Sequence, residues 1–348
     1  MEFNYLTLNK TNIKTYLECF KNNDNVKDHS KVEWQFFESH FQNDFVVIAE
    51  DPSNERPAGI YAMATVKFQI NGKDYLSAQS LDTITDINYR GKGLFTNLAN
   101  RIYERGEKEG LELVYGFPNG NSIHGFTRKL KWDNLDPIPF LIKPLKTKYF
   151  TSKIKPLKWF PNINLSALDF KLNYKTKLVE DFSFPEEVNR LWDVFSKDIS
   201  VSVKRDKEYL DWRYIKKPNE DYKIIHSYDK ETNAYNGFIV FCIKEKHEGK
   251  IAYIMELIYN PSNTRAGREL LNKAISFIKK EKTDTILSWC FDFSPNYEAF
   301  KKNRFFNLPE KLRPIELHFG YRFFNTKNKD IISNRNNWFL SYSDSDTV

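Results

Sequence analysis

The chain has 348 residues, more than one hydrophobic core usually supports, so two domains are expected. Hydrophobic residues make up 41% of it and charged residues 28%, a composition that is typical of globular proteins and excludes a disordered chain. No apolar run reaches the roughly 20 residues of a membrane-spanning helix. A net charge of +7 without a nucleic-acid-binding motif argues against a nucleic-acid partner.

The cysteines and the first residues favour a cytoplasmic protein. The three cysteines occur in apolar or aromatic surroundings, at no spacing that a metal site uses: Cys19, Cys242 and Cys290. We therefore expect buried free thiols and no metal. The first six residues lack the basic and apolar regions of a secretory signal. Nothing in the sequence indicates an oligomeric state.

Two halves of the chain repeat the same landmarks. Trp34-Gln35-Phe36 returns as Trp212-Arg213-Tyr214, 178 positions later. The segment 58–63, with Gly59, returns as 236–241, with Gly237, at the same offset. Landmarks of different type at one offset indicate an internal duplication.

Each half predicts the same elements in the same order. A helical segment comes first, three strands joined by turns follow, and an amphipathic helix then precedes a fourth strand. The predicted strands cover 45–50, 59–68, 75–85 and 113–117 in the first half, and 222–226, 237–244, 251–259 and 285–291 in the second. The amphipathic helices cover 94–103 and 270–278. This order predicts an α+β fold of two tandem units, each a mixed, mostly antiparallel sheet flanked by helices.

A basic segment joins the two halves of the chain. Residues 137–168 contain no acidic residue but hold six lysines: Lys143, Lys146, Lys148, Lys153, Lys155 and Lys158. Such a run is usually solvated surface, and a phosphate-facing or membrane-surface segment is the alternative. We place a basic linker at 146–170, between domains at 1–145 and 171–348.

The turn Arg90-Gly91-Lys92-Gly93 lies between a predicted strand and a predicted helix. A helix N-terminus presents unpaired N–H groups and the positive end of a dipole, so it attracts phosphate. The two glycines let the backbone approach an anion, and Arg90 and Lys92 add positive charge. The turn therefore predicts a phosphate site. It is not a P-loop, because Leu94 follows Gly93, and three strands before it argue against a dinucleotide fingerprint.

From Leu81 to Trp132 the sequence resembles the acyl-CoA-binding core of the GNAT (GCN5-related N-acetyltransferase) superfamily. Arg90 and Gly93 match its pyrophosphate loop, whereas Phe95 stands where a small residue is usual, so the packing there must differ. The resemblance implies that acetyl-CoA or another acyl-CoA is the cosubstrate, with pantetheine on the strand before the turn and pyrophosphate on the turn itself. The implied CoA-binding residues are Thr83, Ile84, Thr85, Arg90, Gly91, Lys92, Gly93, Leu94, Phe95 and Asn121.

The usual catalytic tyrosine of that superfamily is missing. By the resemblance its place is taken by Thr127 in the first half and by Phe300 in the second. The CoA thiolate is a tolerable leaving group without an acid. Asp82 is the candidate base and Gln79 a residue that could orient a water. The alternative for Asp82 is a strand-end aspartate that binds backbone N–H groups.

The second half has lost part of the loop. Aligning the helices places Glu269 on Gly93, and a carboxylate repels pyrophosphate. We therefore expect a degenerate domain that completes the acceptor pocket or is structural. Candidate substrate residues are His124, Trp289 and Asp292, and core packing is the alternative for Trp289. We expect a last strand at 338–342 and a disordered tail at 343–346.

With these features the chain resembles tandem bacterial enzymes of surface-polysaccharide synthesis, such as O-antigen synthesis. They acylate the amine of a nucleotide-linked amino sugar, for example a dTDP-3-amino-3,6-dideoxyhexose, with acetyl or a longer group such as 3-hydroxybutyryl. The resemblance implies this N-acyltransferase reaction, with acyl-CoA and a nucleotide sugar as the partners. The alternatives are a protein or polyamine N-acetyltransferase and a non-catalytic acyl-CoA-binding module.

Overall fold

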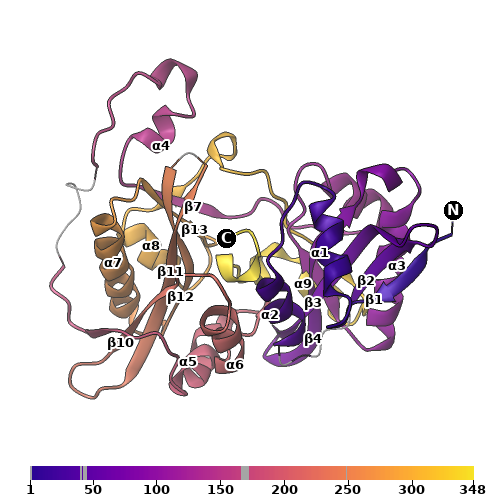
Figure 1. Cartoon of the computed structure of the whole chain (residues 1–348). Helices are drawn as coiled ribbons and strands as arrows, with labels where there is room; N and C mark the ends of the chain where they lie inside the picture. The colour runs from indigo at the N-terminus through magenta and orange to yellow at the C-terminus, as the bar shows by residue number, and fades with distance from the viewer. Residues whose placement is uncertain (1, 40, 42–44, 166–171, 248) are drawn as a thin grey trace. The chain divides into compact units, whose positions relative to one another are not determined.

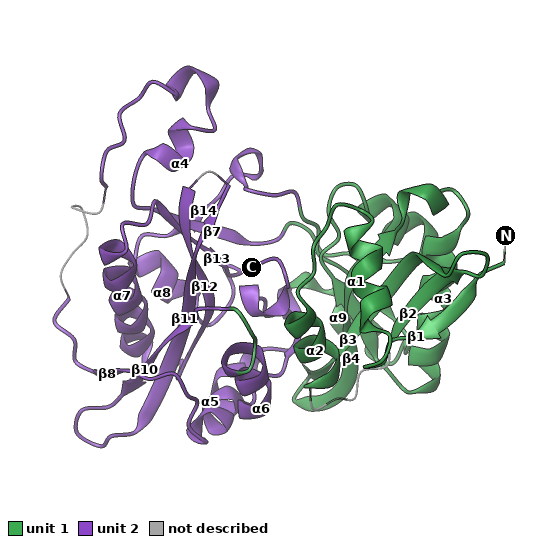
Figure 2. Cartoon of the chain, viewed as in Figure 1, with its two compact units in different colours: residues 1–137, 216–219, 317–335 green, residues 138–215, 220–316, 336–348 purple. Residues whose placement is uncertain are grey.

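The computed structural model describes residues 2–39, 41, 45–165, 172–247 and 249–348 (Figure 1). They form two compact units (Figure 2). The first unit consists of residues 1–137, 216–219 and 317–335, and the second of 138–215, 220–316 and 336–348. Residues 166–170 of the predicted linker, and residue 171 after it, lie outside the described residues. Among the helices of the described ranges, none is both long and apolar enough to cross a membrane.

The first unit is built on one mixed sheet in the order β1-β2-β3-β4-β5-β15-β6. Its strands are β1 (Asn4–Thr7), β2 (Val46–Asp51), β3 (Arg56–Ile70), β4 (Lys73–Thr85), β5 (Leu113–Gly116), β6 (Asp133–Asn134) and β15 (Gly320–Phe323). All neighbours along this order are antiparallel except β4 and β5, which are parallel. Its helices are α1 (Ile13–Lys21), α2 (His29–Phe37), α3 (Leu94–Lys108) and α9 (Lys329–Ser333).

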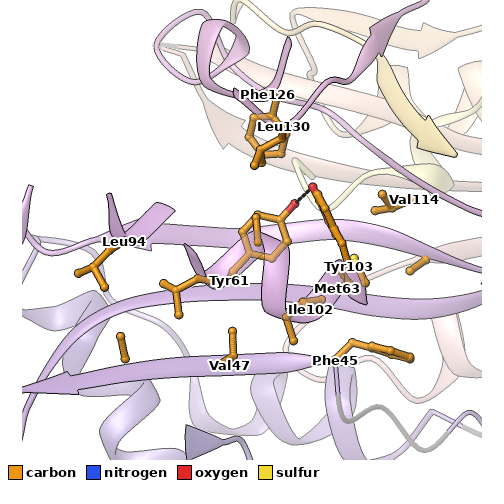
Figure 3. Close-up of a cluster of buried hydrophobic side chains, with 14 of the residues drawn as sticks. Phe45, Val47, Tyr61, Met63, Leu94, Ile102, Tyr103, Val114, Phe126 and Leu130 are labelled. Carbon is orange, nitrogen blue, oxygen red and sulfur yellow. Dashed lines mark hydrogen bonds between the residues drawn. The ribbon is translucent and has the colours of Figure 1, made fainter. Parts of the chain in front are cut away.

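Each face of this sheet has its own core. The apolar stripe of α3 packs on one face, where Leu98, Ile102 and Tyr103 are buried. Helices α1 and α2 cover the other face. On the α3 side the phenol groups of Tyr61 and Tyr103 point toward each other and lie 2.5 Å apart (Figure 3). Burial raises the pKa of Tyr103 to about 12 and raises that of Tyr61 well above its usual value, so both phenols stay neutral and can share this hydrogen bond.

The second unit has a sheet in the order β14-β7-β13-β12-β11-β10-β8, in which only β12 and β13 are parallel. Its strands are β7 (Phe140–Pro144), β8 (Lys177–Glu180), β10 (Lys223–Tyr228), β11 (Tyr235–Lys246), β12 (Gly249–Tyr259), β13 (Thr285–Trp289) and β14 (Phe306–Asn307). The short strand β9 (Val201–Val203) is not part of this sheet. Its helices are α4 (Lys148–Thr151), α5 (Glu187–Phe195), α6 (Lys207–Leu210), α7 (Thr264–Lys280) and α8 (Tyr297–Lys302). The predicted α+β class and the two mixed, mostly antiparallel sheets are confirmed.

The register of the strands repeats between the units. In the first unit Ala49 pairs with Gly59, and a bulge follows immediately because β3 has one extra residue, Ala58. In the second unit Ser227 pairs with Gly237, and a bulge again follows immediately because β11 has one extra residue, Asn236. An irregularity that is conserved in position between two sheets is a designed feature of a fold, so it supports the duplication read from the sequence.

The two sheets exchange one strand each, and this differs from the predicted domain ranges. β15 comes from the predicted second domain but lies between β5 and β6 in the first sheet. β7 comes from the predicted first domain but lies between β13 and β14 in the second sheet. The observed units therefore do not divide at residue 145. A strand's alternating pattern predicts which face is buried, but it does not name the partner strand.

The end of the chain also differs from the sequence-based expectation. Residues 338–342 form no strand beyond one isolated bridge at Trp338. Of the tail expected to be disordered, Ser343, Asp344 and Ser345 are buried. The Asp344 carboxylate is 2.6 Å from the guanidinium of Arg205, which is 139 positions away in the sequence. The run of serine and aspartate looks like an exposed tail only because this buried cation is distant in the sequence.

Candidate functional site

The buried side chain of Tyr89 anchors the turn between β4 and α3. This buried side chain closes a short 3-10 turn, Ile87–Tyr89, and its hydroxyl donates a 2.8 Å hydrogen bond to the carboxylate of Asp51. The ammonium group of Lys92 lies 4.8 Å from the centre of the Tyr89 ring. These contacts fix the turn and leave Arg90 exposed beside it.

The N-terminus of α3 is open. Gly93 is the cap residue, with φ of +74° and ψ of 7°, and it makes no side-chain cap. Gly91 also has a positive φ, +79°, and a β-carbon at either glycine would meet nothing within 4 Å. The glycines are therefore required by the backbone conformation and not by lack of space. With no acidic residue in the first turn of α3, the exposed turn presents the N–H groups and positive charge that a pyrophosphate needs.

Strand β4 offers an edge next to this turn. It pairs with β5 at three positions only, and the last of them joins Ser80 to Gly116. β4 then continues to Thr85, with a bulge at Asp82, whose φ is +46°. The predicted pantetheine residues Thr83, Ile84 and Thr85 are half-buried on this stretch. Because β5 ends there, an extended ligand can pair with the strand edge.

The corresponding features of the second unit are filled by its own side chains. The N-terminus of α7 is capped by Asn263, whose side chain accepts a 3.2 Å hydrogen bond from the N–H of Ala266. A β-carbon at Gly267 would lie 2.2 Å from the ring of Tyr259, so this glycine serves packing. The side-chain amide of Asn296 donates to the Leu257 carbonyl on β12, at 3.0 Å.

Glu269 has a different role from the one predicted for it. It is buried, and its carboxylate accepts hydrogen bonds of 2.9 Å from the N–H groups of Lys175 and Thr176. It therefore binds a neighbouring segment of its own unit. Asn263, Tyr259 and Asn296 are the residues that fill the places corresponding to the open features of the first unit.

Asp82, the candidate base, is engaged by two donors. The hydroxyl of Tyr16 lies 2.6 Å from one carboxylate oxygen, and the ammonium group of Lys27 forms an ion pair with the other. The Asp82 side chain is 5% exposed. Sequence reasoning missed both partners because they lie 66 and 55 positions away.

The second unit contains an equivalent ion pair. Gly59 pairs with Thr85, and Gly237 pairs with Tyr259, so Asp82 and Glu256 each stand three residues before the pairing point. Glu256 is buried and lies 3.0 Å from Arg205. Arg205 follows Lys27 by the same 178 positions that separate the repeated motifs. The repeat offset in the sequence could therefore have identified Lys27 as the counterpart of Arg205, although no catalytic motif includes it.

Thr127 and Gln79 differ in their hydrogen-bond partners. The hydroxyl of Thr127, in the place of the usual tyrosine, donates to the Ile123 carbonyl at 2.9 Å. The Nε2 atom of Gln79 is buried and makes no hydrogen bond within the described residues. Phe95 packs on Phe126, and a β-carbon at Gly125 would lie 3.0 Å from the Phe95 ring, so a glycine makes room for the unusual aromatic residue.

The predicted ligand and acceptor residues are divided between the units. Asn121 and His124 are exposed in the segment after β5 of the first unit. In the second unit Trp289 is 1% exposed and stacks on Tyr342, with ring centroids 4.4 Å apart, so its burial favours core packing. Asp292 is exposed.

Residues 7–134 match the family model of the acetyltransferase (GNAT) domain. No curated protein matches the chain. An N-myristoyltransferase of Saccharomyces cerevisiae with bound myristoyl-CoA is similar in structure, with a TM-score of 0.61 at 13% identity over 92% of this chain and 82% of that one. A GCN5-related N-acetyltransferase from Anabaena variabilis has a TM-score of 0.65 at 11% identity, over 93% and 74%. A probable N-acyltransferase from Enterococcus faecalis has a TM-score of 0.62 at 13% identity, over 93% and 72%.

The structural similarities cover nearly all of the chain, and at these identities they establish its fold. The open turn and the strand edge described above lie inside the residues that the family model matches. Together the domain match and the fold support an acyl-CoA-dependent N-acyltransferase, in which residues 7–134 match the GNAT acetyltransferase domain.

Proposed function

We propose that the protein transfers an acyl group from acyl-CoA to the amine of a nucleotide-linked amino sugar, using a single acyl-CoA site in the first unit. The observation that carries the proposal is the contrast between the N-terminal ends of α3 and α7. Gly93 leaves the N-terminus of α3 open, whereas Asn263 caps that of α7. Phosphate requires free N–H groups, so only the first of these ends is suited to the pyrophosphate of CoA.

In the proposed reaction the amine nitrogen attacks the thioester carbonyl carbon, the C–S bond breaks, and CoA leaves as a thiolate while the nitrogen loses a proton. Holding acyl-CoA along β4 places the thioester for direct attack, and positioning of this kind supplies much of an enzyme's acceleration. Thr127 replaces the usual acid, so the thiolate leaves without one. Asp82 and Gln79 are the proposed base and water-orienting residue. The Asp82 carboxylate can accept a proton only if its contact with Tyr16 or with Lys27 is broken.

The acceptor class rests on the resemblance of the tandem sequence to enzymes of surface-polysaccharide synthesis, and the net charge of +7 suits an acceptor that carries phosphate. The acyl group of the proposal is acetyl or a longer one such as 3-hydroxybutyryl. Because one structural neighbour is an N-myristoyltransferase with bound myristoyl-CoA, the acyl donors tested should extend to that length.

The test is release of free CoA thiol by the full-length protein, followed by mass spectrometry of the product. The donors are acetyl-, 3-hydroxybutyryl- and myristoyl-CoA, and the amines are a dTDP-amino sugar, the same sugar without nucleotide, spermidine and a peptide. We expect turnover with the nucleotide-linked sugar and an added acyl group on its nitrogen. Preferential acylation of spermidine or the peptide would show that the acceptor is a polyamine or a protein instead. Binding of acyl-CoA without thiol release for any amine would favour a binding module.

A further inference from the structure

A basic and aromatic loop, residues 147–163, extends from the second unit and carries α4 (Figure 1). Its two ends are fastened together. The N–H of Thr147 donates to the Ile163 carbonyl at 3.0 Å, and the N–H of Ile163 donates to the Thr147 hydroxyl at 2.8 Å. Just beyond, the N–H of Leu165 donates to the Leu145 carbonyl at 2.7 Å. The loop is therefore a surface loop whose two ends lie close together, and loops of this kind are often functional.

One side of the loop is anchored on its own unit. Tyr149 is buried, and its hydroxyl donates to the Leu312 carbonyl at 3.2 Å. Phe150 stacks on Phe306 with an angle of 16° between the ring planes. The ammonium group of Lys153 lies 4.9 Å from the centre of the Tyr149 ring. These contacts anchor the first part of the loop to its unit.

The second part of the loop exposes large apolar side chains. Trp159 is 80% exposed and contacts Phe160, which is 37% exposed. Leu157 and Ile163 are 36% and 46% exposed. Scattered apolar residues on a surface need no explanation, but four within seven positions, one of them a tryptophan, form a patch of the kind that marks an interaction site.

All the charged side chains of the loop itself are positive. Lys148, Lys155 and Lys158 are exposed, and the sequence has no acidic residue from 137 to 168. On the neighbouring segment Glu310 lies 3.7 Å from Arg313, which offsets its charge. Tryptophan and aliphatic side chains between exposed lysines match the boundary between acyl chains and anionic headgroups. Lysine stems lie along apolar surface while their ammonium groups reach the headgroups.

We propose that this loop docks the protein on an anionic membrane surface, with Trp159, Phe160, Leu157 and Ile163 entering the headgroup boundary and Lys155 and Lys158 contacting the anionic headgroups. The aliphatic pair favours lipid over nucleic acid, because leucine and isoleucine have no ring face on which a base can stack. The attachment is peripheral and stands independently of the proposed enzymatic function.

The test is sedimentation of the full-length protein with vesicles of phosphatidylcholine alone or of equal parts phosphatidylcholine and phosphatidylglycerol. We expect binding to the anionic vesicles that weakens with added salt. Each lysine near an anionic surface contributes about fivefold, so Lys155→Ala with Lys158→Ala should weaken binding about 25-fold. Lys280→Ala with Lys301→Ala removes the same charge from exposed positions elsewhere in the second unit and should leave binding nearly unchanged.

Insertion is measured separately from charge attraction. Vesicles with bromine on their acyl chains should quench part of the tryptophan fluorescence of the natural protein but not that of Trp159→Phe, and Trp159→Ala with Phe160→Ala should reduce sedimentation. The proposal is overturned if the protein does not sediment with anionic vesicles, or if both lysine pairs have the same effect. Tighter binding to single-stranded RNA or to an acidic polypeptide than to vesicles would also overturn it.

Discussion

Asp82 shows how far a single residue can be interpreted from its place in the sequence. Its position on the third predicted strand, near the expected thioester, indicates a base. The contacts of its carboxylate with Tyr16 and Lys27 indicate instead an ion pair that holds the N-terminal segment against β4. The equivalent pair, Arg205 with Glu256, occurs in the unit whose CoA features are filled. A feature that both units keep is more readily explained by the fold than by a reaction proposed for one of them.

The two roles of Asp82 can be separated by comparing Asp82→Asn with Lys27→Met. Both changes break the ion pair, so each should lower the free energy of unfolding, by about 1–3 kcal/mol for a largely buried, hydrogen-bonded charge. Only Asp82→Asn removes the carboxylate. From the repeat we expect similar kcat values for the two variants at saturating substrates. A kcat for Asp82→Asn far below that of Lys27→Met would identify Asp82 as the base.

His226 gives the second unit a pH dependence. Burial lowers the pKa of this imidazole, whose nitrogens lie 2.8 Å from the Tyr235 hydroxyl and 3.2 Å from the Asp181 carbonyl. Below the unfolded pKa of about 6.5 the unfolded chain binds a proton that the folded unit resists. The contribution of His226 to stability is therefore present above that pH and is lost as the pH falls toward its folded pKa.

The measurement is denaturant unfolding at pH about 7.5 and about 5.5, followed by a probe of the second unit. We expect the natural protein to lose more stability between these values than His226→Gln, which retains every other titrating group. Equal losses in the two proteins would show that His226 does not carry this dependence.

At the scale of elements, the helix ends explain why the halves differ. Alignment by helix phase places Glu269 on Gly93 and predicts repulsion of pyrophosphate. The structure gives another cause, because Glu269 binds the N–H groups of Lys175 and Thr176 inside its unit. The differences at the site are the Asn263 cap and the side chain of Asn296 on the edge of β12. Glycine spacing was therefore readable from the sequence, whereas the contacts that fill the second copy depend on distant residues.

Gly93→Glu should abolish CoA binding, because it places a carboxylate and a side chain at the open end of α3, with a loss of at least about tenfold from charge alone. Gly110→Glu is the matched control. Gly110 lies just beyond the other end of α3, also has a positive φ, +78°, and has open space around it. Both variants bear similar backbone strain. Calorimetry should show one CoA per chain for the natural protein and for Gly110→Glu. Unchanged affinity in Gly93→Glu would contradict the loop assignment.

At the scale of the whole molecule, the sequence predicts the elements and their order but not the exchange of β7 and β15. Periodicity along the chain reports local conformation, so the repeated strands and helices were predictable from it. The pairing of β15 with β5 joins segments about two hundred positions apart, and the corresponding strands β7 and β15 suit either sheet by pattern alone. Fold class was therefore predictable, and the division into units was not.

The exchange predicts that the first half is incomplete by itself. β15 covers the edge of β5 from Leu113 to Gly116, and Phe324 just after it packs on Tyr103 of α3, with ring centroids 5.7 Å apart. A fragment of residues 1–145 carries the whole CoA turn and its own β7, but it lacks these contacts. We expect this fragment to show no cooperative unfolding and no CoA binding, because an uncovered β5 exposes both backbone groups and core.

Residues 317–335 joined to the same fragment by a flexible linker should restore both properties, whereas a linker of equal length that ends in a scrambled 317–335 segment should not. Circular dichroism during heating and CoA titration measure the two effects. If residues 1–145 fold and bind CoA without the added segment, β7 must be able to take the place of β15 on β5. The repeated halves would then be self-sufficient, and the exchanged strands would be a choice between two equivalent pairings. Failure of the joined fragment as well would mean that the first unit needs more of the second half of the chain than residues 317–335.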